Sequence, residues 1–151
     1  MDLPASIRRA FQAHGREGGL ARARSLTAEA RGAIARTAAS RRWITVRFGA
    51  ASFERLGLPG ATLIDQGLAD LGAGRKTAES LLVALAAPRL RREGVPVPVG
   101  HVEDPDMRLY RLLEAVHGEL AHARYLALLR QAASFADACA HLRRSRGQDA
   151  R

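Results

Sequence analysis

The sequence predicts an all-α protein: a helical bundle with a basic N-terminal helical arm and at most one short edge strand, near residues 43–48. Three observations support this. Hydrophobic residues make up 47% of the 151 residues but aromatic residues only 5%, so the core must be built from aliphatic side chains. Beyond residue 60 these side chains recur every three or four positions, which places them on one face of a helix. The β-favouring stretch 43–48 has no obvious second strand with which to pair.

The N-terminal third is expected to contain two helices. Residues 4–14 have apolar side chains at helical spacing, and Gly15 is expected to end this helix in the left-handed conformation. Thr27 is expected to cap a second helix that runs to about Arg42. The apolar stripe of this second helix is thin, so the helix needs a partner surface to be stable. Residues 43–48 then follow as an extended connector or a short edge strand.

The middle of the chain is expected to contain one isolated turn and two helices. The turn covers residues 52–56 and is closed by a glycine. Thr62 followed by Asp65 is typical of a capping box at the start of a helix. Thr77 begins the next, strongly apolar helix, which Pro88 is expected to interrupt because its ring clashes with the preceding turn.

The C-terminal part begins with a linker. Residues 94–104 include alternating Val and Pro, which cannot form a central strand because proline lacks an amide donor. Asp104 is expected to cap the following helix, and Gly118 either ends or dents that helix. Ser134 is typical of a further cap, so we expect two or three helices after the linker.

Charge is concentrated at the two ends of the chain. Residues 1–47 carry ten Arg and three acidic residues, 48–107 carry a net negative charge, and 108–151 are again basic. Such clustering is typical of a protein that contacts a polyanion. We therefore predict a basic arm at 1–47, a helical core at 48–146 that contains the linker 94–104, and a frayed tail at 147–151.

Composition excludes several classes of protein. The single cysteine, Cys139, excludes an internal disulfide and a zinc site built from cysteines. No apolar run is long enough to span a membrane, and the start of the chain lacks the pattern of a secretory signal. With a formal net charge of +9, the chain is expected to be a basic cytoplasmic protein.

Two patterns could carry chemistry. Arg111 and His117 fit the Arg-x(4–6)-His pattern of HEPN-type RNases, but about two such matches are expected by chance in so arginine-rich a chain. Glu114 with His117 and Glu119 with His122 form two Glu-x-x-His pairs, which on one helix are rotated by about 140° and cannot hold one metal ion. We therefore predict no catalytic residues, no metal site and no cofactor.

Residues 18–43 read GGLARARSLTAEARGAIARTAASRRW. This stretch resembles a recurrent segment of small basic bacterial regulators that resemble antitoxins, and it is similar to the Lys-Gly-Gly repeat stress proteins, although Glu17 stands where those have Lys. The resemblance covers 26 of the 151 residues and implies an arm that associates with DNA or RNA. The matching positions are Gly18, Gly19, Ala21, Arg22, Ala23, Leu26, Thr27, Glu29, Ile34, Ala35, Arg36, Ala38, Ala39, Arg42 and Trp43.

The arginines of the arm are the candidate contacts, because a guanidinium group binds phosphate through two parallel hydrogen bonds. On a helix Arg31 and Arg42 fall about 20° apart, whereas Arg36 points well away from both. A broad basic surface favours phosphate contacts over the reading of base edges. A helix-turn-helix is an alternative, but about twelve residues separate the two expected helices, more than its short turn allows. The candidate nucleic-acid-binding residues are Arg22, Arg24, Arg31, Arg36, Arg41 and Arg42.

These features predict a small bacterial nucleic-acid-binding regulator, not an enzyme. It is expected to be antitoxin-like, with the arm on DNA phosphates and the helical body covering a protein partner such as a toxin. The first alternative is a non-enzymatic interaction or assembly subunit that does not bind nucleic acid. The second is a HEPN-like RNase that acts through Arg111 and His117.

Overall fold

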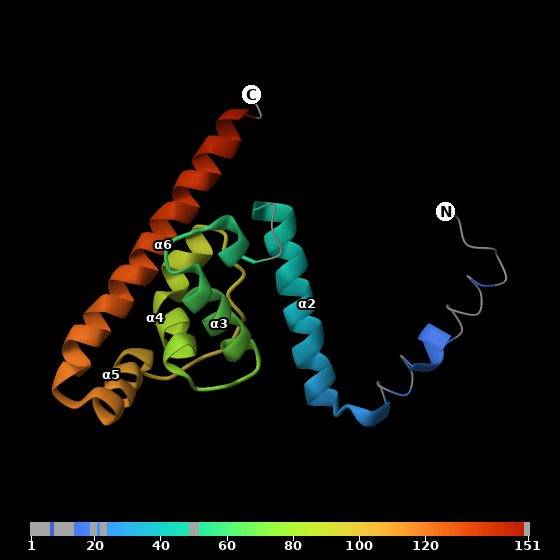
Figure 1. Cartoon of the computed structure of the whole chain (residues 1–151), viewed down its shortest axis with the longest axis horizontal. Coiled ribbons are helices and arrows are strands. Elements are labelled where there is room, and N and C mark those ends of the chain that lie inside the picture. Colours follow the sequence, from blue (N-terminus) through green and yellow to red (C-terminus); the bar gives the residue numbers. More distant parts are fainter. Residues whose placement is uncertain (1–6, 8–13, 19–20, 22–23, 49–51, 150–151) are drawn as a thin grey trace. The chain divides into compact units, whose positions relative to one another are not determined.

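The computed structural model describes residues 7, 14–18, 21, 24–48 and 52–149, and it divides into a smaller unit, residues 1–35, and a larger unit, residues 36–151. Most of the described residues are helical and none of them forms a strand, which confirms the predicted fold class (Figure 1). None of the described helices combines the length and the apolar character needed to cross a membrane. The elements are α2 (Ala28–Phe48), η1 (Glu54–Leu56), α3 (Ala61–Gly72), α4 (Ala78–Arg92), α5 (Pro105–His117), η2 (Gly118–Leu120) and α6 (Ala121–Asp149).

In the smaller unit, the structure confirms one predicted cap and corrects one predicted end. Thr27 caps α2, since its Oγ1 accepts a hydrogen bond of 3.1 Å from the amide of Ala30. The predicted helix 4–14 lies almost entirely outside the described residues. Gly15, however, is helical and has no positive φ, so it does not end a helix; the described stretch 14–18 continues past it.

The expected extended segment at 43–48 is instead the C-terminal end of α2. Ile44 and Phe48, four residues apart, are both buried in the core, and Phe48 packs against Phe53 with ring centroids 5.1 Å apart. The β preference of branched and aromatic residues is weak, and burial of one helical face outweighs it. The basic arm predicted at residues 1–47 therefore extends past the smaller unit, which ends at residue 35. Residues 36–48, the rest of α2, belong to the larger unit.

The core of the larger unit lies among its last four α-helices. Helix α4 packs against α3, α5 and α6, and α5 also packs against α6 (Figure 1). At its centre Phe53 lies edge-on to Phe135, with ring centroids 5.0 Å apart. The core is therefore not purely aliphatic as composition predicted, because two large, fully buried rings fill its centre. Gly67 allows α3 to approach α4 closely, because a Cβ at this position would overlap the carbonyl group of Glu79. Fully buried side chains from every one of these helices fill the core, namely Ile64, Leu82, Val83, Leu90, Leu109, Phe135 and Cys139.

Helix α3 does not begin with the predicted capping box. Its N-cap is Gly60, with φ 70°, and no side chain caps it. The carboxylate of Asp65 turns instead to the preceding turn, where it accepts hydrogen bonds from the amides of Phe53 at 3.2 Å and Glu54 at 2.9 Å. That turn, η1, is closed by Gly57 with φ 66°, as expected.

The link between α3 and α4 is held by a buried carboxylate. Asp70 accepts hydrogen bonds from Gln66 at 2.9 Å, Arg75 Nε at 2.8 Å and Thr77 Oγ1 at 2.7 Å. Burial alone would raise the pKa of Asp70, but the hydrogen bonds from Thr77, Arg75 and Gln66 outweigh it and hold the pKa below its usual value. Thr77 also caps α4 through a capping box with Ser80, which confirms the predicted start of that helix.

Two other predicted boundaries change, and one predicted cap is absent. Helix α4 continues through Pro88 to its last residue, and α6 continues through Ser134 without a new cap. Asp104 precedes α5 as predicted, but with φ 44° and without a side-chain cap. Gly118 ends α5, with φ 53°. The predicted linker 94–104 lacks helix and strand, and its buried Val95 and Val97 form part of the core.

Candidate nucleic-acid interface

The described candidate arginines are all exposed. Arg24 and Arg31 belong to the smaller unit, whereas Arg36, Arg41 and Arg42 lie on the part of α2 that belongs to the larger unit. Arg22 lies outside the described residues. The segment 36–48 is anchored to the core through Ile44 and Phe48, so the three arginines of the larger unit project from a fixed helix.

Carboxylates do not neutralise these arginines. Among the described side chains, no acidic group lies within 4.0 Å of the guanidinium of Arg24, Arg31, Arg36, Arg41 or Arg42. Elsewhere in the larger unit, arginines do pair with acidic groups. Those pairs are Arg75–Asp70, Arg89–Asp137, Arg108–Glu103 and Arg143–Glu93.

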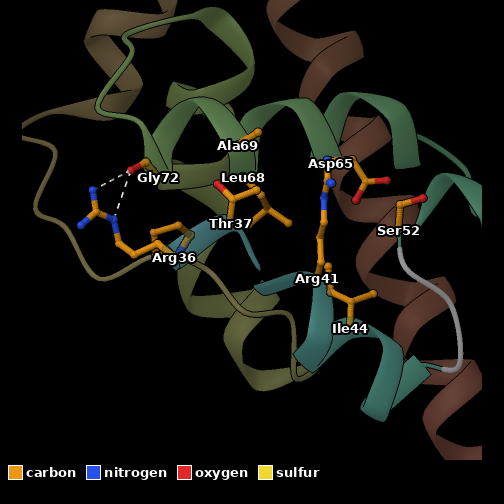
Figure 2. A pocket seen from close by; sticks show the side chains of 10 residues that line it. Arg36, Thr37, Arg41, Ile44, Ser52, Asp65, Leu68, Ala69 and Gly72 are labelled. Atoms are coloured by element: carbon orange, nitrogen blue, oxygen red, sulfur yellow. Dashed lines mark hydrogen bonds between the residues drawn. The ribbon is translucent and has the colours of Figure 1, made fainter. Parts of the chain in front are cut away.

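A hollow of about 110 Å³ lies between α2 and α3 (Figure 2). Helix α2 contributes two of the predicted arginines, and α3 forms the opposite wall. The linker 94–104 contributes Pro98. The lining residues are Arg36, Thr37, Arg41, Ile44, Ser52, Asp65, Leu68, Ala69, Gly72 and Pro98.

Arg36 lies at one end of the hollow and contacts the C-terminal end of α3. Its Nε and Nη2 donate to the carbonyl oxygen of Gly72 at 3.4 and 3.3 Å (Figure 2). The exposed carbonyls at a helix C-terminus carry partial negative charge, which attracts a cation. Both distances are at the long end for a hydrogen bond, so Arg36 is held weakly.

Arg41 extends toward Asp65 (Figure 2). Burial raises the pKa of the Asp65 carboxyl group; the amides of Glu54 and Phe53 and the charge of Arg41 oppose this rise without cancelling it. Both carboxylate oxygens already accept hydrogen bonds, from the backbone amides of Phe53 and Glu54 at the start of η1. Asp65 is therefore directed at the turn, and it offsets the charge of Arg41 only in part.

Sequence reasoning found the arginines but not the hollow. Asp65, Gly72 and Pro98 come from segments far apart in the sequence, and no local pattern links them to Arg36 and Arg41. They meet only where α2, α3 and the linker 94–104 come together in the folded larger unit.

The residues of the catalytic alternatives lie on other helices. Arg111 and His117 share α5, and a separation of six residues turns them about 240° apart around its axis. The described part of the chain brings no three His, Cys, Asp or Glu side chains close enough to hold a metal ion.

No family model matches the chain, and neither a curated protein nor a solved structure gives a match. The resemblance of residues 18–43 to small basic regulators therefore stays a prediction.

Proposed function

We propose that this chain is a small regulator that binds nucleic acid, with DNA the expected target, by contacting backbone phosphates through its arginines. One observation carries the proposal: the described arginines of the candidate set are exposed and have no carboxylate within ion-pair distance among the described residues. Such guanidinium groups keep their charge and their donors available for phosphate oxygens. The proposed contacts are Arg24, Arg31, Arg36, Arg41 and Arg42, with Arg22 as a further expected contact.

The positions of the arginines on α2 favour phosphates over bases. Arg36, Arg41 and Arg42 point in three directions around the helix, since steps of five residues and one residue turn the side chain by about 140° and 100°. Reading base edges requires several side chains on one narrow face that enters a groove, whereas phosphate contacts tolerate a broad distribution.

The helical body is the proposed site for a protein partner, as in an antitoxin that covers its toxin. Large apolar side chains are exposed on α5 and in the turn after it: Met107 by 52%, Val116 by 68% and Leu120 by 69%. Large apolar side chains exposed to solvent are candidate protein contacts, but nine residues place Met107 and Val116 on opposite faces of α5, so the three do not form one patch. In the competing proposal, the chain is an assembly subunit and its arginines bind an acidic protein.

Salt dependence tests the proposal. Each phosphate neutralised steepens the fall of log affinity with log salt by about 0.9 for duplex DNA. Replacing Arg36, Arg41 and Arg42 with Ala should therefore reduce the slope by about 2.7 if each contacts one phosphate. The matched control replaces Arg124, Arg130 and Arg144, which are exposed on α6, and removes the same net charge.

The expected result is a large loss of DNA affinity in the α2 variant and a much smaller loss in the α6 control. Equal losses would mean that net charge alone attracts the DNA. The absence of binding to both duplex DNA and RNA at about 50 mM salt would refute the proposal and favour the assembly subunit.

A further inference from the structure

A second, larger hollow lies at the link between α3 and α4, where it faces the end of the linker 94–104 and the start of α5. Its volume is about 450 Å³, within the range of about 300–1,000 Å³ that is usual for small-molecule sites. The hollow between α2 and α3, by comparison, measures about 110 Å³. The described arginines that we propose as nucleic-acid contacts do not line this second hollow, so it can have a ligand of its own.

One side of the second hollow is apolar. Leu81 on α4 is buried, and Leu71 on α3 and Val102 in the linker are half-buried and pack against the core. Because the core holds all three segments in place, this apolar side has a fixed shape against which a ring can lie. Small-molecule sites generally combine such an apolar lining with a few polar groups that fix the orientation of the ligand.

The polar side of the second hollow contains an arginine that is held in place. Arg75 Nε donates to Asp70 Oδ1 at 2.8 Å, and Arg75 Nη2 donates to the same oxygen. Asp70 is only 2% exposed, and hydrogen bonds from Gln66 and Thr77 fix its carboxylate. The Arg75 side chain nevertheless remains 57% exposed. A guanidinium group has five N–H donors, so the two that bind Asp70 leave three for a ligand, which binds with little further loss of side-chain freedom.

The charges around the second hollow leave it net positive. Lys76 follows Arg75 in the chain and also lines the hollow, and no acidic group of the described residues lies within 4.0 Å of its ammonium group. Arg108 lies 3.6 Å from the carboxylate of Glu103, which is too far for a good hydrogen bond. The three cations of the lining therefore have two carboxylates near them, those of Glu103 and Asp70. An anion would provide charge and acceptors that the protein does not supply here.

From these observations we infer that the second hollow binds a phosphate monoester that carries a ring, with a nucleoside monophosphate as the class of ligand. At pH 7 such a phosphate has a charge of about −1.5 to −2 and three acceptor oxygens, which suit the fixed donors of Arg75. The long, flexible side chain of Lys76 lets its ammonium group reach the phosphate that Arg75 binds. The ring lies against Leu71, Leu81 and Val102. This site shares no residue with the proposed nucleic-acid contacts, so either proposal can fail without the other.

Calorimetry with the whole chain and three probes tests the inference. Adenosine monophosphate has the ring and the phosphate, adenosine has the ring without the phosphate, and inorganic phosphate has the charge without the ring. We expect adenosine monophosphate to bind, and the other two to bind at least about tenfold more weakly. Lys76→Gln should weaken the binding of adenosine monophosphate about tenfold. The matched control, Arg111→Gln, removes one charge from an exposed position on α5 outside the lining and should leave that binding unchanged.

Chemical labelling gives a second readout, on the unchanged chain. Lys76 is the only lysine, so acetylation of lysine side chains reports on this hollow alone. Saturating adenosine monophosphate should slow the acetylation of Lys76 severalfold, as measured by mass spectrometry of the peptide that contains it. Adenosine at the same concentration should leave the rate unchanged.

Four results would overturn the inference. Adenosine binding as tightly as adenosine monophosphate would show that the cations do not select the ligand, and inorganic phosphate binding as tightly would show a site for charge alone. Equal losses in Lys76→Gln and Arg111→Gln would show that net charge, and not this hollow, attracts the ligand. An absence of saturation by adenosine monophosphate up to about 10 mM, with Lys76 acetylated at an unchanged rate, would show that the hollow binds no such ligand. The comparison among probes and the labelling use the unchanged chain, so the test does not depend on the variants folding.

Discussion

Replacing Gly67 with Ala should destabilise the protein through a single added methyl group. The new Cβ would overlap the Glu79 carbonyl group and lie 2.5 Å from Val83 Cγ2, both on α4. Because a backbone group cannot rotate away as a side chain can, α3 and α4 must separate by about 1 Å to restore normal contact. Overpacking of this kind costs about 1–3 kcal/mol, while alanine recovers about 0.5–1 kcal/mol of helix preference.

We expect a net loss of about 1 kcal/mol, measured by urea denaturation, and a fall in Tm of roughly 2–4 °C for a chain of this size. Gly72→Ala, at the end of the same helix, is the matched control. Its Cβ would lie 3.6 Å from Pro98 Cγ, an ordinary contact, so its stability should stay equal or rise by up to about 1 kcal/mol. If the two variants unfold at the same urea concentration, the close approach of α3 and α4 is wrong.

Three further predictions concern titratable groups. Because the pKa of Asp70 is held low, its carboxylate stabilises the fold above about pH 4, and this contribution is lost as the pH falls further. Asp70→Asn should cost about 1–3 kcal/mol at pH 7 and flatten the acid side of a stability–pH curve; an equally steep curve would contradict this. Burial raises the pKa of Cys139 to about 12, so Ellman's reagent should react with it only after unfolding, and rapid labelling of the native protein would refute its burial. The hydrogen bond to Asp106 raises the pKa of Tyr125 to about 12, and Asp106→Asn should return this titration toward 10 in ultraviolet absorbance; a titration that does not move would exclude the bond.

The parts of the fold that could be predicted from the sequence are those that depend on residues close together in the chain. Thr27 and Thr77 cap helices because a hydroxyl at that position satisfies amides within three residues, and Gly57 closes a turn because its φ is positive. The predictions of an extended segment at 43–48 and of a new helix start at Ser134 were wrong, because both stretches lie inside helices. Their helical state depends on contacts distant in sequence, such as that of Phe135 with Phe53.

The candidate site likewise has one part that the sequence predicts and one part that it does not. Exposure of the arginines on α2 follows from composition and the thin apolar stripe of the helix, both readable from the chain. The hollow beneath Arg36 and Arg41 depends on which helix covers α2, and the Asp65 carboxylate, expected to cap its own helix, turns to another segment instead. Long-range pairing of helices has no signature in a single sequence.

The aromatic rings at the end of α2 give the protein a built-in optical reporter. Trp43 is the only tryptophan of the chain, and its ring centroid lies 6.5 Å from that of Phe48. Phe48 in turn packs against Phe53, and Phe53 against Phe135 on α6. Trp43 is 42% exposed, so its emission wavelength will respond when this end of the helix leaves the body of the protein or is covered by another molecule. Detachment of α2 can thus be followed in the unlabelled chain, separately from melting of the remaining helices, whose signal is in the far ultraviolet.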